Sequence, residues 1–168
     1  MNVINDNVII VAARVALNDY KLYGCYICQE NRNFRLDSMY MAFYYKNKIT
    51  RYIPQILGYI DSIDISNPNL DNLAITTVAA SESEVKKRLN NFLTQYQNSK
   101  NFYFSKNKII ILSLPTDIRT VKLDHEIINN KTDKRGLKRV PFTQSNRYST
   151  ISKLRSSFYT KDLESLRD

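Results

Sequence analysis

Runs of β-branched, aliphatic and aromatic residues, separated by short polar turns, recur along the chain and predict a strand-rich fold. The run over 39–45 (MYMAFYY) is apolar or aromatic at every position, so we expect that strand to be covered on both faces. Pro54 and Gly58 argue against a helix in the next apolar stretch and favour a bent strand there. The predicted strands span residues 8–15, 22–29, 39–45, 52–65, 73–78, 101–105, 108–114 and 119–123, with polar turns at 46–48 and 106–107.

Helical spacing of apolar residues is clearest over 81–96, where Ser81 and Glu84 form a capping box. A polar, basic loop or arm follows over 124–148, and helical spacing returns in the C-terminal segment 149–168. Because the helices do not alternate with the strands, the pattern favours an α+β fold, mostly β, over a doubly wound sheet. We expect a single domain over 1–168, folded as a closed or partly closed β-barrel with flanking helices.

Positive charge is concentrated at the C-terminal end of the chain. The chain has 25 lysine and arginine residues against 16 aspartate and glutamate residues, a net charge of +9. Residues 131–168 contain 10 of these basic residues and 4 of the acidic ones, a net charge of +6. A local positive field attracts polyanions, of which nucleic acid is the commonest. No run approaches the roughly 18 apolar residues of a membrane span, and the early apolar run is too short for a secretory signal. The chain is therefore expected to be cytoplasmic, with no membrane partner.

Residues that could support catalysis are sparse. Cys25 and Cys28 have metal-ligand spacing, but His125 is the single histidine, so a four-ligand zinc site cannot be assembled from cysteine and histidine alone. In a strand, the two thiols would point to opposite faces, which predicts two small buried apolar side chains. Three glycines cannot form the phosphate-binding loops of nucleotide-dependent enzymes. The sequence thus predicts no catalytic centre, no metal and no cofactor.

Cations interleaved with aromatic residues give a stronger signal for binding, since cations contact phosphates and aromatic rings stack on unpaired bases. Two arginines flank an aromatic residue after the second predicted strand, and a larger set lies in the basic C-terminal third. These candidate nucleic-acid-binding residues are Arg32, Phe34, Arg35, Lys134, Arg135, Lys138, Arg139, Arg147, Tyr148, Lys153 and Arg155.

Three motifs carry a resemblance to a known family. They are Tyr26-x-Cys28-Gln29-x-x-Arg32-x-Phe34, the run 39–44, and Arg147-Tyr148-Ser149-Thr150-Ile151-x-x-Leu154. Together they resemble PUA-like barrels of the EVE-related type, which occur in bacterial defence and restriction proteins. The resemblance implies a PUA-like small mixed β-barrel with flanking helices.

This family binds nucleic acid, often by drawing a modified base out of the stack into an aromatic pocket. The resemblance therefore implies that Arg32, Phe34, Tyr40 and Tyr44 lie near such a pocket, with Arg147 and Tyr148 at its rim. Tryptophans often line the family's pockets; this chain has none, so tyrosine or phenylalanine would have to replace them. Family members are commonly fused to a nuclease or helicase, which here implies a separate partner chain.

The leading hypothesis is a nucleic-acid-binding module, with DNA favoured over RNA, acting as a specificity component of a bacterial defence or restriction system. An alternative is a protein–protein adaptor with a tyrosine-rich surface. A third is a minimal metal-dependent nuclease built on Asp117, Asp124, His125 and Glu126.

Overall fold

The computed structural model describes residues 5–35, 37–96, 105–143 and 147–164. The strands are β1 (Asn7–Ala12), β2 (Cys25–Gln29), β3 (Tyr40–Tyr45), β4 (Lys48–Ile49), β5 (Tyr52–Ile53), β6 (Ile56–Ile63), β7 (Thr76–Thr77), β8 (Asn107–Leu112), β9 (Val121–Lys122), β10 (Ile127–Ile128) and β11 (Arg147–Thr150). The helices are α1 (Ala16–Tyr23), α2 (Glu82–Tyr96), α3 (Ile151–Ser156) and α4 (Thr160–Glu164). The predicted strand-rich α+β class is confirmed. None of the helices in these ranges is long and apolar enough to cross a membrane.

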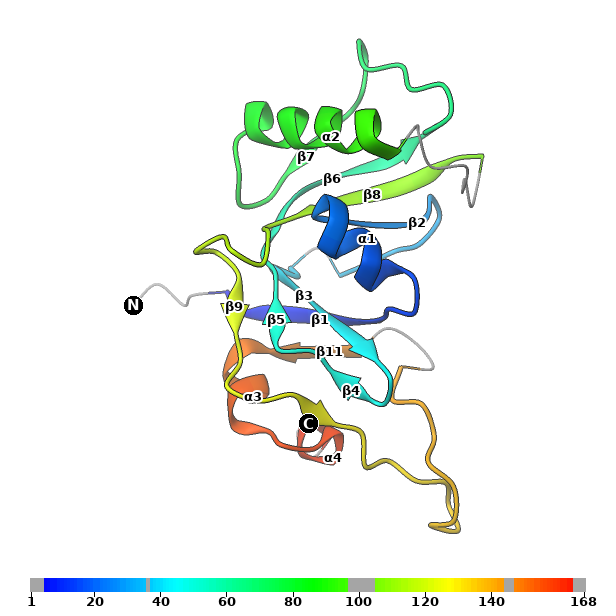
Figure 1. Ribbon diagram of the computed structural model, residues 1–168, viewed down its shortest axis with the longest axis vertical. Coiled ribbons are helices and arrows are strands. Elements are labelled where there is room, and N and C mark those ends of the chain that lie inside the picture. Colours follow the sequence, from blue (N-terminus) through cyan, green and yellow to red (C-terminus); the bar gives the residue numbers. More distant parts are fainter. Residues whose placement is uncertain (1–4, 36, 97–104, 144–146, 165–168) are drawn as a thin grey trace.

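The strands form two main sheets that curl into a half-barrel (Figure 1). One sheet has the order β10-β4-β3-β1-β11, the other has the order β2-β8-β6-β7, and β5 pairs with β9 in a separate ribbon. The bent stretch predicted over 52–65 joins the two main sheets. Gln55 bridges Tyr40 of β3 just before β6 turns away to pair with β8. Pro54, which cannot donate a hydrogen bond, lies at this bend.

Strands β1 and β3 pair in parallel at the centre of the first sheet and are buried on both faces, as predicted for 39–45. Side chains alternate between the two faces of a strand. One face, with Ile9 and Phe43, packs into the interior of the half-barrel. The other face, with Ile10 and Tyr44, packs against the C-terminal part of the chain. The β3–β4 turn at Lys46 and Asn47 has positive φ at both residues, as hairpins with two-residue loops require.

Helix α1 was missed by the sequence analysis, which extended strands over 8–15 and 22–29. The first strand ends at Ala12, and the second begins only at Cys25. Leu17 and Tyr20, three residues apart, pack into the half-barrel interior, and Tyr20 stacks on Phe43 at 5.0 Å. Gly24 ends the helix with φ +67°, where a Cβ would lie 2.2 Å from the Arg88 side chain.

The predicted helix over 81–96 is confirmed as α2, which covers the outer face of β6 and β8 (Figure 1). Its buried face is the predicted one: Val85, Leu89, Phe92, Leu93 and Tyr96. Ser81 accepts a hydrogen bond from the Glu84 backbone N–H at 3.2 Å, so the cap is present. The Glu84 carboxylate binds an arginine instead of completing a capping box.

Other predicted boundaries shift. The strand over 73–78 is reduced to β7, and the strand over 119–123 to β9. Asn107, predicted in a turn, is the first residue of β8, and most of the strand predicted over 101–105 lies outside the described residues. The predicted loop over 124–148 contains β10 and the first residues of β11, and the segment 149–168 begins with the end of β11 before α3 and α4. Apolar pairs such as Ile127 and Ile128 are too short to show a period in the sequence.

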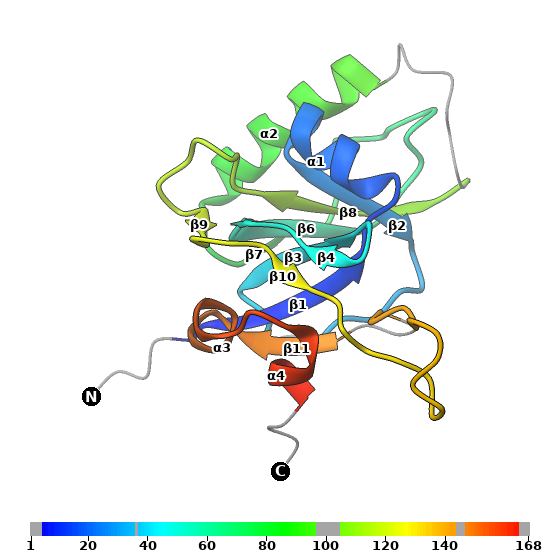
Figure 2. The same ribbon diagram turned by 60° about the horizontal axis from the view of Figure 1, so that its bottom comes forward.

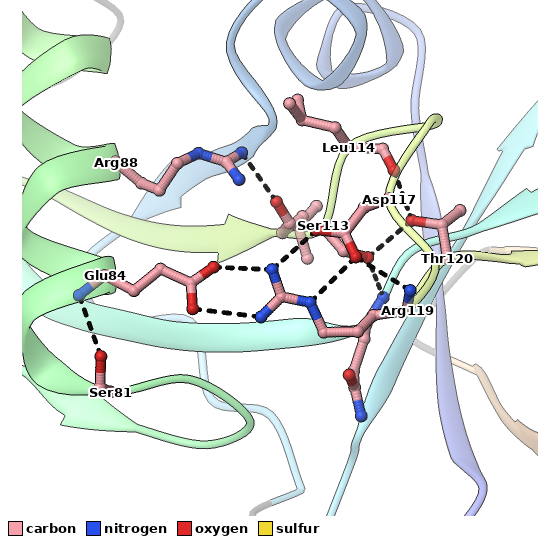
Figure 3. Close-up of polar contacts among 10 residues, drawn as sticks. Ser81, Glu84, Arg88, Ser113, Leu114, Asp117, Arg119 and Thr120 are labelled. Atoms are coloured by element: carbon pink, nitrogen blue, oxygen red, sulfur yellow. Dashed lines mark hydrogen bonds and ion pairs between the residues drawn. The ribbon is translucent and has the colours of Figure 1, made fainter.

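A polar network fixes α2 to the loop after β8 (Figure 3). Arg119 donates to both carboxylate oxygens of Glu84, at 2.6 and 3.2 Å, and to both of Asp117, at 2.7 and 3.0 Å. Its hydrogen bonds lower the pKa values of the Asp117 and Glu84 carboxyls and raise that of the guanidinium. Charged pairs with two-pronged geometry of this kind are stronger than ordinary surface ion pairs.

We expect Arg119→Gln to lower the free energy of unfolding by about 1–2 kcal/mol near pH 7, since both carboxylates lose charged hydrogen bonds in a partly exposed site. The folded-state pKa values of Asp117 and Glu84 are depressed. The stabilisation is therefore complete above their unfolded values, near 4, and is lost as the pH falls through the folded values. Urea unfolding at pH 7 and pH 3, with Lys87→Gln on the same helix as the control, checks this. The prediction would be wrong if the difference in free energy of unfolding between wild type and Arg119→Gln were as large at pH 3 as at pH 7.

Candidate functional site

A cavity of about 230 Å³ opens into the half-barrel interior between the two main sheets. Its apolar floor comes from β1, β6, β8 and Val78, and Phe34 and Tyr59 contribute aromatic rings to its lining. The remaining lining residues are polar or charged: Asn33, Arg35, Ser38, Asp61 and Lys108. Helix α1 packs on the same interior beyond Ala13, whereas the cavity lies near Ile9, toward the start of β1. The cavity is therefore the part of the half-barrel interior that α1 does not fill.

Lys108 is the charged residue set deepest in this wall. Its side chain is 9% exposed, and its Nζ lies 2.7 Å from the Asp61 carboxylate. The same Nζ donates to the Arg32 carbonyl at 3.1 Å and lies 5.5 Å from the ring centres of both Phe34 and Tyr59. A buried ammonium needs a partner and hydrogen bonds to remain charged, and Asp61 and Arg32 supply them. Lys108 thereby holds the segment after β2 against the mouth of the cavity.

Arg32 extends the stack of cations and rings. Its guanidinium donates to the Tyr26 hydroxyl at 2.8 Å and lies 5.9 Å from the ring centres of Tyr26 and Phe34. Those two rings pack edge to face at 6.2 Å. Burial raises the pKa of Tyr26 to about 12, so its hydroxyl stays protonated. The predicted grouping of Arg32 with Phe34 is thus a packed unit beside the cavity.

A second hollow, also about 230 Å³, adjoins the first and shares Arg35 with it. Its lining includes Tyr148 and Thr150 of β11 and Lys153 of α3. The Arg35 guanidinium lies 5.1 Å from the Tyr148 ring centre, and the Arg35 backbone N–H donates to the Tyr148 hydroxyl at 3.2 Å. Residues 113 positions apart in the sequence thus meet at one rim. Arg35 also pairs with Asp37 at 3.1 Å, in an exposed ion pair.

Ser38 adds a polar group to the cavity wall. It is 6% exposed, and its hydroxyl has no hydrogen-bond partner among the residues that the structure describes. A buried hydroxyl without a partner costs free energy. A bound ligand with a polar edge would remove that cost.

The predicted binding residues fall into four groups, the last of which is Tyr40, Tyr44 and Arg147. Arg32, Phe34, Arg35, Tyr148 and Lys153 gather around the two hollows. The four cations Lys134, Arg135, Lys138 and Arg139 lie on an exposed hairpin elsewhere in the fold. Arg155 is exposed on α3 and lines neither hollow.

Tyr40, Tyr44 and Arg147 do not line the cavity, contrary to the placement that the family resemblance implied. The alternation along β3 sends Met41 and Phe43 into the half-barrel, so Tyr40 and Tyr44 face the opposite side. There the Tyr44 hydroxyl accepts a hydrogen bond from Asn129 at 2.9 Å. Arg147 donates to the Phe142 carbonyl at 3.0 Å and lies over the Phe142 ring.

Tyr59, Asp61 and Lys108 line the cavity but were not predicted from the sequence. In β8, Lys108 occupies the same face as Ile110 and Leu112, so a lysine continues an apolar face. Tyr59 and Asp61 likewise share one face of β6. Side chains alternate between the two faces of a strand. Applied to β6 and β8, this alternation would have predicted polar residues on an otherwise apolar face, which indicates a cavity wall.

The cysteines and the acidic cluster have structural roles. Cys25 packs under α2 and Cys28 faces the half-barrel interior, which confirms that they are buried on opposite faces. His125 stacks on Phe158 at 4.0 Å, and Glu126 pairs with Lys48 at 2.5 Å. Asp117 is bound to Arg119, so the four residues of the nuclease hypothesis do not converge. In the described part of the chain, no group of three or more His, Cys, Asp or Glu side chains could hold a metal ion.

Comparisons with family models, with curated proteins and with solved structures found no match to this chain.

We expect both thiols to be inert in the folded protein. Burial raises the pKa of Cys28 to about 11 and raises that of Cys25 further, so very little reactive thiolate is present at pH 8. Ellman's reagent should react slowly with native protein and at once in guanidinium chloride, and Cys28→Ser should leave one equally protected thiol. Fast reaction of a native thiol would show that β2 is exposed in solution.

Proposed function

We propose that this protein binds nucleic acid by accepting one unstacked base in the half-barrel cavity while the neighbouring phosphates contact the second hollow. The observation that carries the proposal is the position of Arg35. It lines both the aromatic cavity and the second hollow, which also contains Lys153, so one ligand with a planar ring and a nearby anionic group would fill both. A nucleotide within a strand has this composition.

The cavity suits a base in size and chemistry. It is smaller than the roughly 300–1,000 Å³ of typical pockets for drug-sized ligands, which favours a single planar ring system. Phe34 and Tyr59 offer rings for stacking, and stacking on aromatic side chains is the main sequence-tolerant contact to unpaired bases. Asp61 and Ser38 offer an acceptor and a hydroxyl to the polar edge of a base.

The second hollow suits a phosphate. Arg35 and Lys153 line it together with the carboxylate of Asp37 and the polar residues Asn7, Tyr148, Ser149 and Thr150, so its two cations outnumber its one anion. Arg35 can exchange its exposed partner Asp37 for a phosphate, because an ion pair in solvent contributes little. Arginine binds phosphate oxygens through two parallel hydrogen bonds. The two hollows would thus bind adjacent parts of one strand.

The half-barrel and the site around Arg32, Phe34 and Tyr148 are in keeping with the resemblance to PUA-like barrels of the EVE-related type. On that basis we propose a cytoplasmic module that recognises a base, modified or not, in DNA. It would serve as a specificity component for a separate nuclease or helicase chain of a bacterial defence or restriction system.

The adaptor and nuclease hypotheses have weaker support. Tyr20, Tyr26, Tyr44 and Tyr96 are buried in the core, so much of the tyrosine content is structural. Among the described residues, the exposed tyrosines are Tyr52 on β5, Tyr148 on β11 and Tyr159 in the link between α3 and α4. They do not form the aromatic centre typical of protein interfaces.

The base-binding proposal predicts that Phe34→Ala and Tyr59→Ala each weaken binding to a short single-stranded DNA by about 5- to 100-fold, the range expected for loss of one stacked base. Tyr52→Ala is the matched control, because Tyr52 is also a partly exposed tyrosine with a cation over its ring, but it lies on β5. Fluorescence anisotropy with modified and unmodified oligonucleotides measures the affinities, and thermal unfolding checks that each variant folds. Equal affinities for all three variants would place the site elsewhere.

The phosphate contacts predict a salt effect. The slope of log K against log salt should fall by about 0.7 for each phosphate contact removed from a single strand. Arg35→Gln combined with Lys153→Gln should therefore reduce the slope by roughly 1.4. The absence of any binding to DNA or RNA at low salt would contradict the proposed function as a whole.

A further inference from the structure

A basic hairpin, residues 131–140, projects from the end of the molecule that carries β11, α3 and α4 (Figures 1 and 2). Thr132 bridges Arg139, and backbone hydrogen bonds join Asp133 to Lys138 at 2.8 Å and Val140 to Lys131 at 3.1 Å. The Asp133 carboxylate accepts from the Leu137 backbone N–H at 2.9 Å, which closes the turn. The hairpin is therefore closed by one β-bridge, the adjacent backbone hydrogen bonds and its turn.

The tip of the basic hairpin combines cations with one apolar side chain. Leu137 is 79% exposed, beside Gly136 with φ +73°. Two basic pairs flank these two residues: Lys134 and Arg135 before them, Lys138 and Arg139 after them. Across the described ranges, no acidic side chain forms an ion pair with any of these four cations. Leu137 is therefore a large, mostly exposed apolar side chain among cations that no carboxylate of the described residues neutralises.

The root of the basic hairpin is anchored in the core by Asn129, which is fully buried. Its side-chain NH2 donates to the Tyr44 hydroxyl at 2.9 Å and to the Val140 carbonyl at 2.8 Å. Its carbonyl oxygen accepts from the Thr160 hydroxyl at 2.9 Å and from the Lys131 backbone N–H at 3.1 Å. Both ends of the hairpin are thus tied to one buried amide, which fixes the direction in which the hairpin points.

We infer that the basic hairpin enters a groove of duplex DNA and that Leu137 inserts between base pairs as a wedge. Proteins that unstack a duplex insert apolar side chains between base steps from the minor groove, and neighbouring cations contact the phosphates. Four unpaired cations around one exposed leucine match that design. The inference rests on the proposed function, because a wedge that opens the stack would make a base available to the cavity. Base-acting proteins must supply this unstacking energy.

The test uses the full chain and a DNA duplex that carries 2-aminopurine, whose fluorescence rises when the base is unstacked. Wild type should bind and raise the fluorescence. Leu137→Ala should lose most of the rise and bind the duplex roughly tenfold more weakly, because the wedge is removed while the cations remain. Leu137→Met, which keeps the length and apolar character, should retain the rise. Leu70→Ala, at another exposed leucine in a loop beside β7, is the matched control.

The possible outcomes distinguish the Leu137 wedge from the base-binding cavity. Duplex binding with the same fluorescence for wild type and Leu137→Ala, or binding with no rise at all, overturns the wedge and leaves the base-binding cavity standing. A wild type that binds single strands and no duplex also overturns it. A wild type that binds no nucleic acid contradicts the proposed function itself. Replacement of the four cations by glutamine should abolish duplex binding. The single strand should remain bound, because it contacts the two hollows. An unchanged duplex affinity would show that the hairpin is not the duplex contact.

Discussion

The parallel pairing of β1 with β3 is the constraint on which the rest of the structure depends. Each strand is buried on both faces, and the pairing of Ile9 with Met41 and of Val11 with Phe43 places one set of side chains inside the half-barrel. Val8, Ile10, Ala42 and Tyr44 face the other way. A shift of one residue would exchange the two sets. Because both layers pack tightly, the fold has one acceptable register, and that register decides which residues can reach the cavity.

Both surfaces proposed for binding follow from this division. The cavity lies on the interior side, where β6 and β8 contribute Tyr59 and Lys108. The basic hairpin lies on the other side, where Tyr44 and Asn129 anchor its root. The two sites are therefore supported by opposite faces of the same central strands. Arg119 fixes α2 over the second sheet, so the wall that carries Tyr59 and Lys108 is supported from behind as well.

Much of the fold was predictable because its signals are local. The run over 39–45 and the capped helix after Ser81 each fix their own structure through burial and hydrogen bonding, and both predictions are confirmed. Helix α1 was missed because it is short and its two buried residues, Leu17 and Tyr20, do not make a clear period. Strands of two residues such as β7, β9 and β10 form through pairing with distant partners, which no local pattern reveals.

The candidate site was predictable in part. Arg32, Phe34 and Arg35 form a compact sequence cluster, of which Phe34 and Arg35 line the cavity and Arg32 lies over the Phe34 ring. Tyr40 and Tyr44 were misplaced because their face depends on the pairing of β3, and Lys108 was missed because its role depends on the cross-strand pairing with Asp61. Contacts between distant segments, such as that of Arg35 with Tyr148, require the whole topology.

The central claim is that a base enters the cavity that Phe34 and Tyr59 help to line. Photocrosslinking of the full chain to an oligonucleotide that carries one 5-iodouracil, followed by mass spectrometry of the crosslinked peptides, tests it most directly. The account predicts crosslinks to Phe34 or Tyr59 that excess unlabelled oligonucleotide suppresses. Crosslinks confined to other parts of the chain, with none to Phe34, Tyr59 or the residues beside them, would contradict it.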